Sequence, residues 1–173
     1  LVLDQQYGDG NQKQREYSGS YSAEILYPID NFQFEASGKR SINQKFSNNK
    51  SHRVGVSYKL NNGKLFFNHS TAYKNPSFTE RYGYYAGTFI GNPDLKPESA
   101  RQYEAGYSFE SIDKNLNISQ TYYNMKLKNE INGFVAIGGG NYSAKNMPNR
   151  SHRRGVESKL TYKINNSENF SIS

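Results

Sequence analysis

The stretch GNPDLKPESARQYEAGY, residues 91–107, joins a proline-containing segment directly to a run in which every second residue is apolar or aromatic. Pro93 and Pro97 fix their own φ angles and disfavour helix at the residues before them, so the first half is stiff and extended. In the second half, Tyr103 and Tyr107 alternate with polar residues, as in a two-faced β-strand. A rigid entry into a strand explains the prolines better than direct ligand contact.

Alternation with a period of two recurs along most of the chain. It predicts seven complete strands and the start of an eighth, at residues 17–29, 32–39, 52–60, 64–73, 101–109, 116–128, 153–164 and 170–173. Aromatic residues are favoured in strands, and they make up 14% of the chain, with 15 Tyr and 10 Phe. The chain is therefore expected to be all-β.

The connections between these strands alternate strictly between short and long. The short ones are residues 28–31, 61–63, 111–115 and 165–169, and the long ones are 41–51, 74–99 and 129–151. In an antiparallel up-and-down meander, this order places every tight turn at one end of the sheet and every long loop at the other, as in outer-membrane barrels. The alternation thus favours part of a large transmembrane β-barrel.

A soluble antiparallel sheet with one wet face is the main alternative to a barrel. The polar faces are too polar to form the second layer of a sandwich, and the apolar faces are rich in Tyr and Phe, which suit lipid-facing bands. Only 34% of the residues are hydrophobic, and mean hydropathy is −0.93. No apolar run approaches the roughly 20 residues of a membrane helix, and the first residues lack a signal-peptide pattern.

Charge and residue inventory exclude several classes of site. The net charge is +7, but the basic residues are scattered in the sequence, which argues against a nucleic-acid surface. The chain has no cysteine, and His52, His69 and His152 lie in separate strands, so no metal site is expected. The glycine-rich residues 136–143 lack the strand-to-helix context of a phosphate loop and are expected to form a flexible loop. No catalytic motif and no cofactor are predicted.

Three segments together resemble the barrel of TonB-dependent outer-membrane receptors: NPSFTERYG (75–83), GNPDLKPESARQYEAGY (91–107) and NMPNRSHRRGVESKL (146–160). They match the family's motifs in order and spacing over about the second half of the chain. The matching positions are Asn75, Pro76, Glu80, Tyr82, Gly91, Asn92, Pro93, Leu95, Pro97, Glu98, Tyr103, Glu104, Gly106, Asn146, Gly155, Val156 and Glu157.

The resemblance implies a receptor with a barrel of about 22 strands that encloses an N-terminal plug. On this interpretation, residues 1–173 are a C-terminal part of the barrel and contain no plug domain and no TonB box. The implied partners are outer-membrane lipid, the plug, the remaining barrel strands, TonB and a small-molecule or metal-chelate ligand. The implied function is uptake of a scarce nutrient, such as a ferric siderophore, haem or cobalamin, across a bacterial outer membrane.

Two other functions remain open at the sequence level: a passive porin-like or structural barrel, and a soluble basic β-domain that binds nucleic acid or polysaccharide. Glu104 and Glu157 are expected to face the lumen, where they either pair with a basic partner, such as Arg53 or a residue of the plug, or remain solvated. Aromatic residues in the long loops either contact a ligand or pack within the loops. These candidates are Tyr82, Tyr84, Tyr85, Phe89, Phe134 and Tyr142.

The proposed register can be tested with cysteine substitutions along one strand. A lipid-soluble thiol reagent should label cysteines at positions 103, 105 and 107 and spare those at 102, 104 and 106, because successive side chains point to opposite faces of a sheet. Mass spectrometry of the labelled protein in membranes gives the extent of modification. Equal labelling of the two sets would contradict the register.

Overall fold

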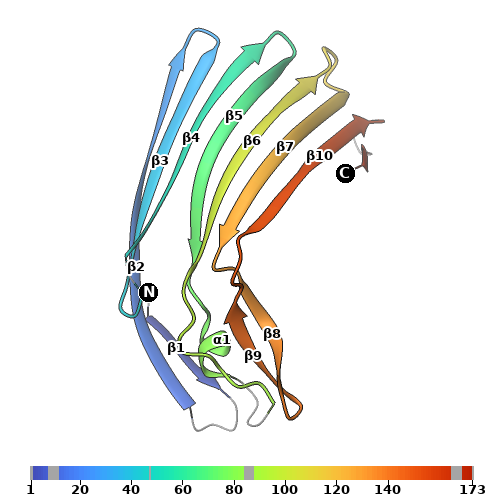
Figure 1. The fold of residues 1–173 in the computed structure, drawn as a ribbon. Coiled ribbons are helices and arrows are strands. Elements are labelled where there is room, and N and C mark those ends of the chain that lie inside the picture. Colours follow the sequence, from blue (N-terminus) through green and yellow to red (C-terminus); the bar gives the residue numbers. More distant parts are fainter. Residues whose placement is uncertain (1, 8–11, 47, 84–87, 165–168, 173) are drawn as a thin grey trace.

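The computed structural model describes residues 2–7, 12–46, 48–83, 88–164 and 169–172 and shows a long, curved antiparallel sheet (Figure 1). Nine strands form this sheet in the order β1-β2-β3-β4-β5-β6-β7-β10-β11, and β8 and β9 form a separate hairpin. The strands are β1 (Val2–Tyr7), β2 (Gln12–Ile29), β3 (Phe32–Asn43), β4 (Asn49–Leu60), β5 (Gly63–Lys74), β6 (Glu98–Glu110), β7 (Leu116–Lys128), β8 (Ile131–Gly138), β9 (Asn141–Asn146), β10 (Ser151–Lys163) and β11 (Asn169–Ile172).

The predicted antiparallel meander is confirmed, and each predicted strand is present. Several strands extend beyond their predicted bounds at the long-loop end; β6 begins at Glu98, not near residue 101, and β4 begins at Asn49, not at residue 52. The extra residues are mostly polar or charged, so the alternation fades there although backbone pairing continues. Strand β1 was not predicted, because its sequence VLDQQY does not alternate.

Two further elements lie within segments predicted as loops. Helix α1 (Phe78–Tyr82) is a single short turn of helix, and hairpin β8–β9 occupies most of residues 129–151. The glycine-rich residues 136–143, predicted as a flexible loop, instead form the end of β8, a tight turn at 139–140 and the start of β9, and Gly138, Gly139 and Gly140 have φ values of 95°, 61° and 77°. Among the described residues, no helix is long and apolar enough to cross a membrane.

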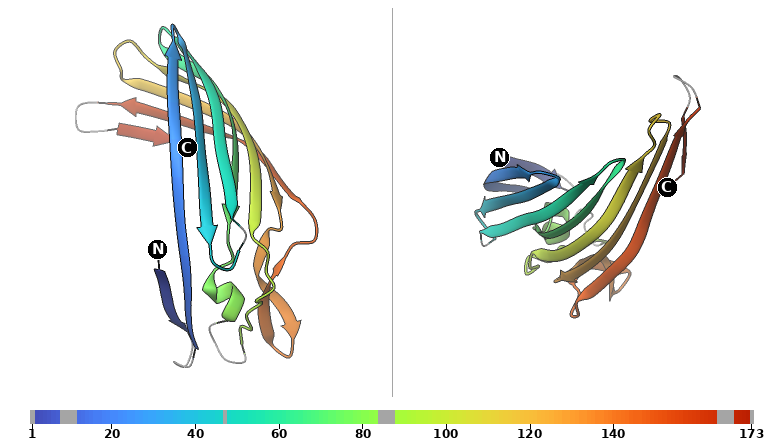
Figure 2. Two further views of the ribbon diagram at one scale, coloured as in Figure 1. Left: turned by 90° about the vertical axis from the view of Figure 1, so that its left-hand side faces the viewer. Right: turned by 90° about the horizontal axis from the view of Figure 1, so that it is seen from above.

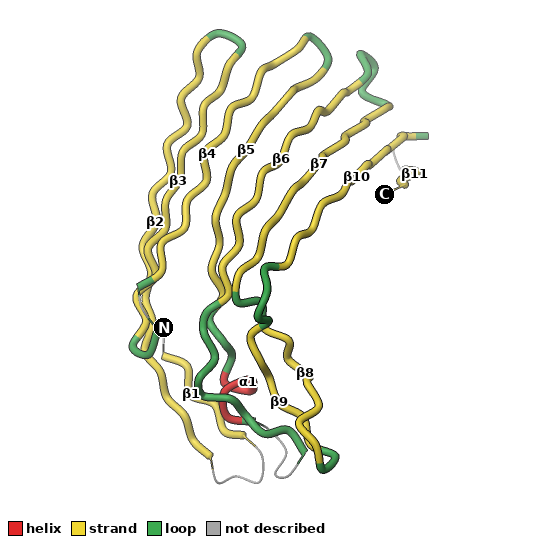
Figure 3. Tube along the Cα trace, in the orientation of Figure 1, coloured by secondary structure: helices red, strands yellow, loops and turns green. Residues whose placement is uncertain are grey.

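The tight turns gather at one end of the sheet and the longer connections at the other (Figure 3). Asp30 and Lys114 stand in two of the tight turns with φ values of 50° and 58°. In the second of these turns, the Ser111 hydroxyl and the Asn115 backbone N–H donate to the Asp113 carboxylate and hold its pKa below the usual 3.8. The last predicted turn, residues 165–169, lies almost wholly outside the described residues.

Seen along its axis, the sheet is an arc, and α1 lies on its concave side (Figure 2). An unbroken register lines up the same class of residue on each face: Ile25 pairs with Ala36, which pairs with Val54 on the next strand. These three residues lie on the convex face, and all are exposed. A sheet whose apolar face is solvent-accessible in the isolated chain is what a lipid-facing wall requires.

The concave face accommodates large side chains over glycines. The ring of Phe66 lies over Gly106 and that of Tyr123 over Gly155, so that an added Cβ would come within 2.7 Å and 2.8 Å of ring or hydroxyl atoms. A Cβ at Gly106 would also lie 2.4 Å from the Gln120 carbonyl oxygen. Such close packing against backbone cannot relax by a rotamer change. Gly38, on the convex face, has nothing within 4 Å of its added Cβ.

Gly106→Val should destabilise the barrel wall by about 1–3 kcal/mol, as overpacking of close-packed sites does. Gly38→Val is the matched control and should leave stability nearly unchanged, since its side chain projects into open space. Thermal unfolding of the detergent-solubilised protein, followed by heat-dependent gel mobility, measures both. Equal melting temperatures for the two variants would contradict the packing described here.

Candidate functional site

The long-loop end of the sheet carries a small folded unit made of α1, residues 88–97 and hairpin β8–β9. Its buried core consists of Phe89, Leu95, Ile131 and Ala144, with Tyr142 packed against it. Residues 88–90 run beside β9: Ile90 N–H donates to the Tyr142 carbonyl at 2.8 Å, and Tyr142 N–H donates to the Thr88 carbonyl at 2.9 Å. This end is therefore an ordered platform above the wall.

A capping box starts α1. The Ser77 hydroxyl accepts from the Glu80 N–H, and the Glu80 carboxylate accepts from the Ser77 N–H at 2.7 Å. The Glu80 carbonyl then accepts from Asn92 N–H at 2.9 Å, which ties the helix to the proline-containing segment. Gly91 runs directly against the helix end, since an added Cβ would lie 2.3 Å from Tyr82 N. Glycine at 91 permits this approach.

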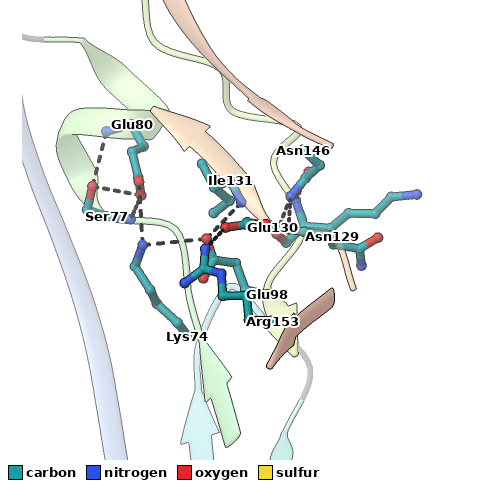
Figure 4. Close-up of polar contacts among 10 residues, drawn as sticks. Lys74, Ser77, Glu80, Glu98, Asn129, Glu130, Ile131, Asn146 and Arg153 are labelled. Carbon is teal, nitrogen blue, oxygen red and sulfur yellow. Dashed lines mark hydrogen bonds and ion pairs between the residues drawn. The ribbon is translucent and has the colours of Figure 1, made fainter. Parts of the chain in front are cut away.

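Asn92 and Asn146 connect the proline-containing segment to the hairpin. Asn92 donates through Nδ2 to the Ala144 carbonyl at 2.9 Å. Asn146 accepts from Lys96 N–H at 2.8 Å and donates through Nδ2 to the carbonyls of Lys96 and Asn129, at 2.9 and 2.8 Å. Figure 4 shows its bond to Asn129 at the base of the hairpin. One amide therefore joins three parts of the chain.

Three carboxylates, from α1, β6 and the β7–β8 connection, complete this junction (Figure 4). Glu98 accepts from Ile131 N–H at 2.7 Å, so the first residue of β6 holds the first residue of β8. The Lys74 ammonium lies 3.6 Å from Glu98 and 3.8 Å from Glu80. Glu130 pairs with Arg153 of β10. Charged groups of the loops and of the wall strands therefore hold the loop unit against the wall.

Arg81 anchors α1 on the concave face and is 3% exposed. Its Nη2 lies 2.6 Å from the Glu16 carboxylate of β2. Its guanidinium stacks on three rings, with its carbon 5.0, 4.9 and 5.1 Å from the ring centres of Phe46, Phe78 and Tyr82. Sequence analysis did not single out Arg81, because Glu16 and Phe46 are remote in sequence and no local pattern could reveal them.

The aromatic candidates for ligand contact fall into different environments. Phe89 is 4% exposed, whereas Phe134 is 56% exposed. The Phe134 ring stacks on both Phe89 and Tyr142, with ring centres 5.7 and 4.4 Å apart. Tyr82 packs on Arg81 and accepts from Lys45 Nζ at 3.3 Å. Tyr84 and Tyr85 lie outside the described residues. Phe89 is therefore a buried packing residue of the loops, whereas the ring of Phe134 is exposed and available for contact.

The strand positions of the motif line the wall. Tyr103 and Val156 lie on the convex face, 44% and 58% exposed. Glu104 lies on the opposite face and accepts from Gln102 Nε2 at 2.8 Å. Arg53 lies beside Glu35, with Nε and Oε1 2.8 Å apart, and so its partner is not the suggested Glu104. Glu157 lies on the concave face and is exposed.

The remaining motif positions lie at the base of the loop unit. Asn75 accepts through Oδ1 from Asn49 Nδ2 at 3.0 Å, which links the end of β5 to the start of β4. Pro76 is buried, Pro97 is half-buried and Pro93 is exposed. Within the described ranges, no group of three His, Asp or Glu residues is placed to hold a metal ion.

Residues 2–172 match the family model described as TonB dependent receptor-like, beta-barrel. The chain belongs to this TonB-dependent receptor family. Barrels of this family are outer-membrane proteins, and this chain is accordingly part of a bacterial outer-membrane barrel. The convex apolar face is therefore the lipid-facing surface, and the long-loop end is the extracellular end.

Individual relatives agree with the family. The chain is 30% identical over 98 residues to the vitamin B12 transporter BtuB of Photobacterium profundum, which is 56% of this chain and 15% of that protein. The siderophore receptor PirA of Pseudomonas aeruginosa superposes with a TM-score of 0.77 at 17% identity, over 98% of this chain and 33% of that one.

The Serratia marcescens hemophore receptor HasR, solved with its hemophore HasA and heme, superposes with a TM-score of 0.75 at 17% identity, over 88% of this chain and 32% of that one. At this level of identity, the two superpositions establish the fold. The chain spans about a third of the length of the two solved receptor chains and 15% of the transporter.

Asn146→Ala should loosen the receptor's loop unit, because it removes three hydrogen bonds and leaves the backbone groups of Lys96 and Asn129 unpaired. We expect a loss of about 1–3 kcal/mol in local stability. Asn146→Asp keeps the acceptor for Lys96 N–H but loses both donors, so it should lie between alanine and wild type. Hydrogen exchange at residues 92–97 measures the effect, and unchanged exchange in Asn146→Ala would contradict it.

Proposed function

We propose that this chain is part of the barrel of an active-transport receptor that imports a scarce nutrient across the outer membrane. The observation that carries the proposal is the junction made by Glu80, Asn92, Glu98 and Asn146, all positions of the family motif. These residues hold an ordered platform of loops at the extracellular end. A platform fixed to the wall suits a receptor that presents a binding surface.

The three relatives compared above are named for a vitamin B12 transporter, a siderophore receptor and a hemophore receptor. The proposed cargo is accordingly a ferric siderophore, haem or cobalamin. These ligands are bulky, and exposed aromatic side chains offer large contact area at low entropic cost. Phe134 meets this requirement because its ring is exposed and stacks on the rings of Phe89 and Tyr142.

The remaining parts of such a receptor complete the proposal. Plugged transporters of this type have about 22 strands, and the nine-stranded sheet has β1 and β11 at its edges. We infer that further strands pair with these edges, that a plug fills the lumen, and that TonB supplies energy through the N-terminal part. The polar concave face, with Glu104 and the Glu35–Arg53 pair, would face that plug. The receptor would carry out transport without covalent chemistry.

Uptake assays in a strain lacking the chromosomal gene test this function. Cells that express the full-length receptor should take up one ligand from a panel of ferric siderophores, haem and cobalamin, and should fail to do so when TonB is deleted. Uptake that continues without TonB would favour a passive porin. Failure to transport any member of the panel, with the receptor correctly assembled, would contradict the proposed cargo class.

Phe134→Ala should weaken binding of the transported ligand about fivefold or more, since a stacked aromatic contact of about 1–3 kcal/mol is lost. Ile137→Ala is the matched control: this residue lies on the same strand and is 41% exposed, but it has no part in the aromatic stack. Equilibrium binding to purified receptor measures both. Equal affinities would exclude Phe134 from the ligand site and leave the transport function itself untouched.

A further inference from the structure

The convex face separates apolar and basic residues into two bands. Strands β3, β4, β5, β6, β7 and β10 are fully described, and in each of them every second residue lies on this face. Within seven residues of the tight turns, no Lys or Arg of these six strands lies on the convex face. The concave face has Lys59 and Lys64 beside a turn, so only the convex face excludes cations there.

Beyond this apolar band, basic residues follow one another around the wall. Counted from the tight-turn end of each strand, five of them lie eight to ten residues along it, and Lys128 lies two residues further along β7. We call these five exposed residues the basic belt: Arg40, Lys50, Arg101, Lys126 and Arg154. They come from five strands and from positions spread over more than a hundred residues of sequence, and the register alone brings them together.

The basic belt lies at the height above the tight turns at which the apolar band of an outer-membrane barrel ends. Strands rise about 3.3 Å per residue, and barrel strands tilt by about 35–45°, so eight to ten residues correspond to about 19–27 Å above the turns. The apolar band of outer-membrane barrels is about 25 Å tall. The basic belt thus lies at the headgroup level of the outer leaflet. Tyr103 and His69 stack just below it, with ring centres 4.5 Å apart, as in an interfacial aromatic girdle.

The charges of the belt are not neutralised within the described part of the chain. All five carboxylates of the six strands lie on the concave face: Glu35, Glu98, Glu104, Glu110 and Glu157. Arg40 is directly opposite Lys50, and Arg101 is directly opposite Lys126. Like charges in such cross-strand positions repel each other and destabilise the sheet. A bound anion between the members of each pair would remove that repulsion.

We propose that the basic belt binds the phosphorylated headgroups of lipids in the outer leaflet. Phosphate oxygens accept charge-assisted hydrogen bonds from guanidinium and ammonium groups, and Arg suits them especially because it can bind in a bidentate manner. One phosphate bridges Arg101 and Lys126, with Arg154 on the next strand beside them, and a second bridges Arg40 and Lys50. The acyl chains of the same lipid then lie along the apolar band below.

Lipid retention by the full-length receptor in detergent tests this proposal. The probe is a diphosphorylated glycolipid of the lipid A type, detected by native mass spectrometry, and phosphatidylcholine and the fully dephosphorylated glycolipid serve as comparisons. The double variant Arg101→Ala with Lys126→Ala should retain the phosphorylated glycolipid at least tenfold less well, since each basic residue near an anionic lipid surface contributes about 1 kcal/mol. Raising the salt concentration should weaken retention by wild type more than by the variant.

Lys39→Ala with Lys159→Ala is the matched control, because it removes the same charge from the concave face of β3 and β10. It should retain the lipid as wild type does. Equal retention by belt variant and control would overturn the proposal, as would displacement of the lipid by equimolar inorganic phosphate or a change of oligomeric state in place of lipid loss. If the first double variant does not assemble, Arg40→Gln with Lys50→Gln tests the second pair in the same assay.

Discussion

Backbone hydrogen bonding is the constraint on which the rest of this structure depends. In hydrocarbon, every N–H and C=O group must find a partner within the protein, and a sheet does so by pairing each strand with its neighbours. From β2 to β10 the strands of the main sheet have 12 residues or more and pair without a bulge in the register, although the β4–β5 pairing covers only residues 53–60 and 63–70. Because the register is unbroken, each side chain of the wall faces either lipid or the lumen.

The two faces of the sheet meet different physical requirements. The convex face must be apolar at membrane depth and can carry charge only at its outer edge, and the basic belt lies at that edge. The concave face can hold charges at any height, because its partners are water and other protein groups. Side chains on this face nevertheless pack closely where a glycine leaves room for a large side chain from the next strand, as Phe66 over Gly106 shows. The wall is therefore thin, and its two surfaces are specified independently by alternate residues.

The extracellular loops are held by polar groups more than by a large core. The buried cluster around Phe89 and Leu95 is small, and the single amide of Asn146 joins the proline-containing segment to the hairpin. Arg81 secures the helix to the inside of the wall through the Glu16 carboxylate of β2 and the ring of Phe46 in the β3–β4 connection. Such a unit keeps its shape without covering the exposed ring of Phe134, which suits the ligand-binding role proposed for this end of the barrel.

Local sequence patterns were sufficient to predict the two-faced strands, the alternation of tight turns and long loops, and the family, because each of these depends on residues that are close together in the chain. They did not reveal helix α1 or hairpin β8–β9, since short elements within loops depend on distant partners such as Asn92 and Ala144. In sequence the basic residues looked scattered. Only the tertiary register placed Arg101 opposite Lys126 and both at one membrane depth, because hydrogen-bonded strands bring together residues that lie far apart along the chain.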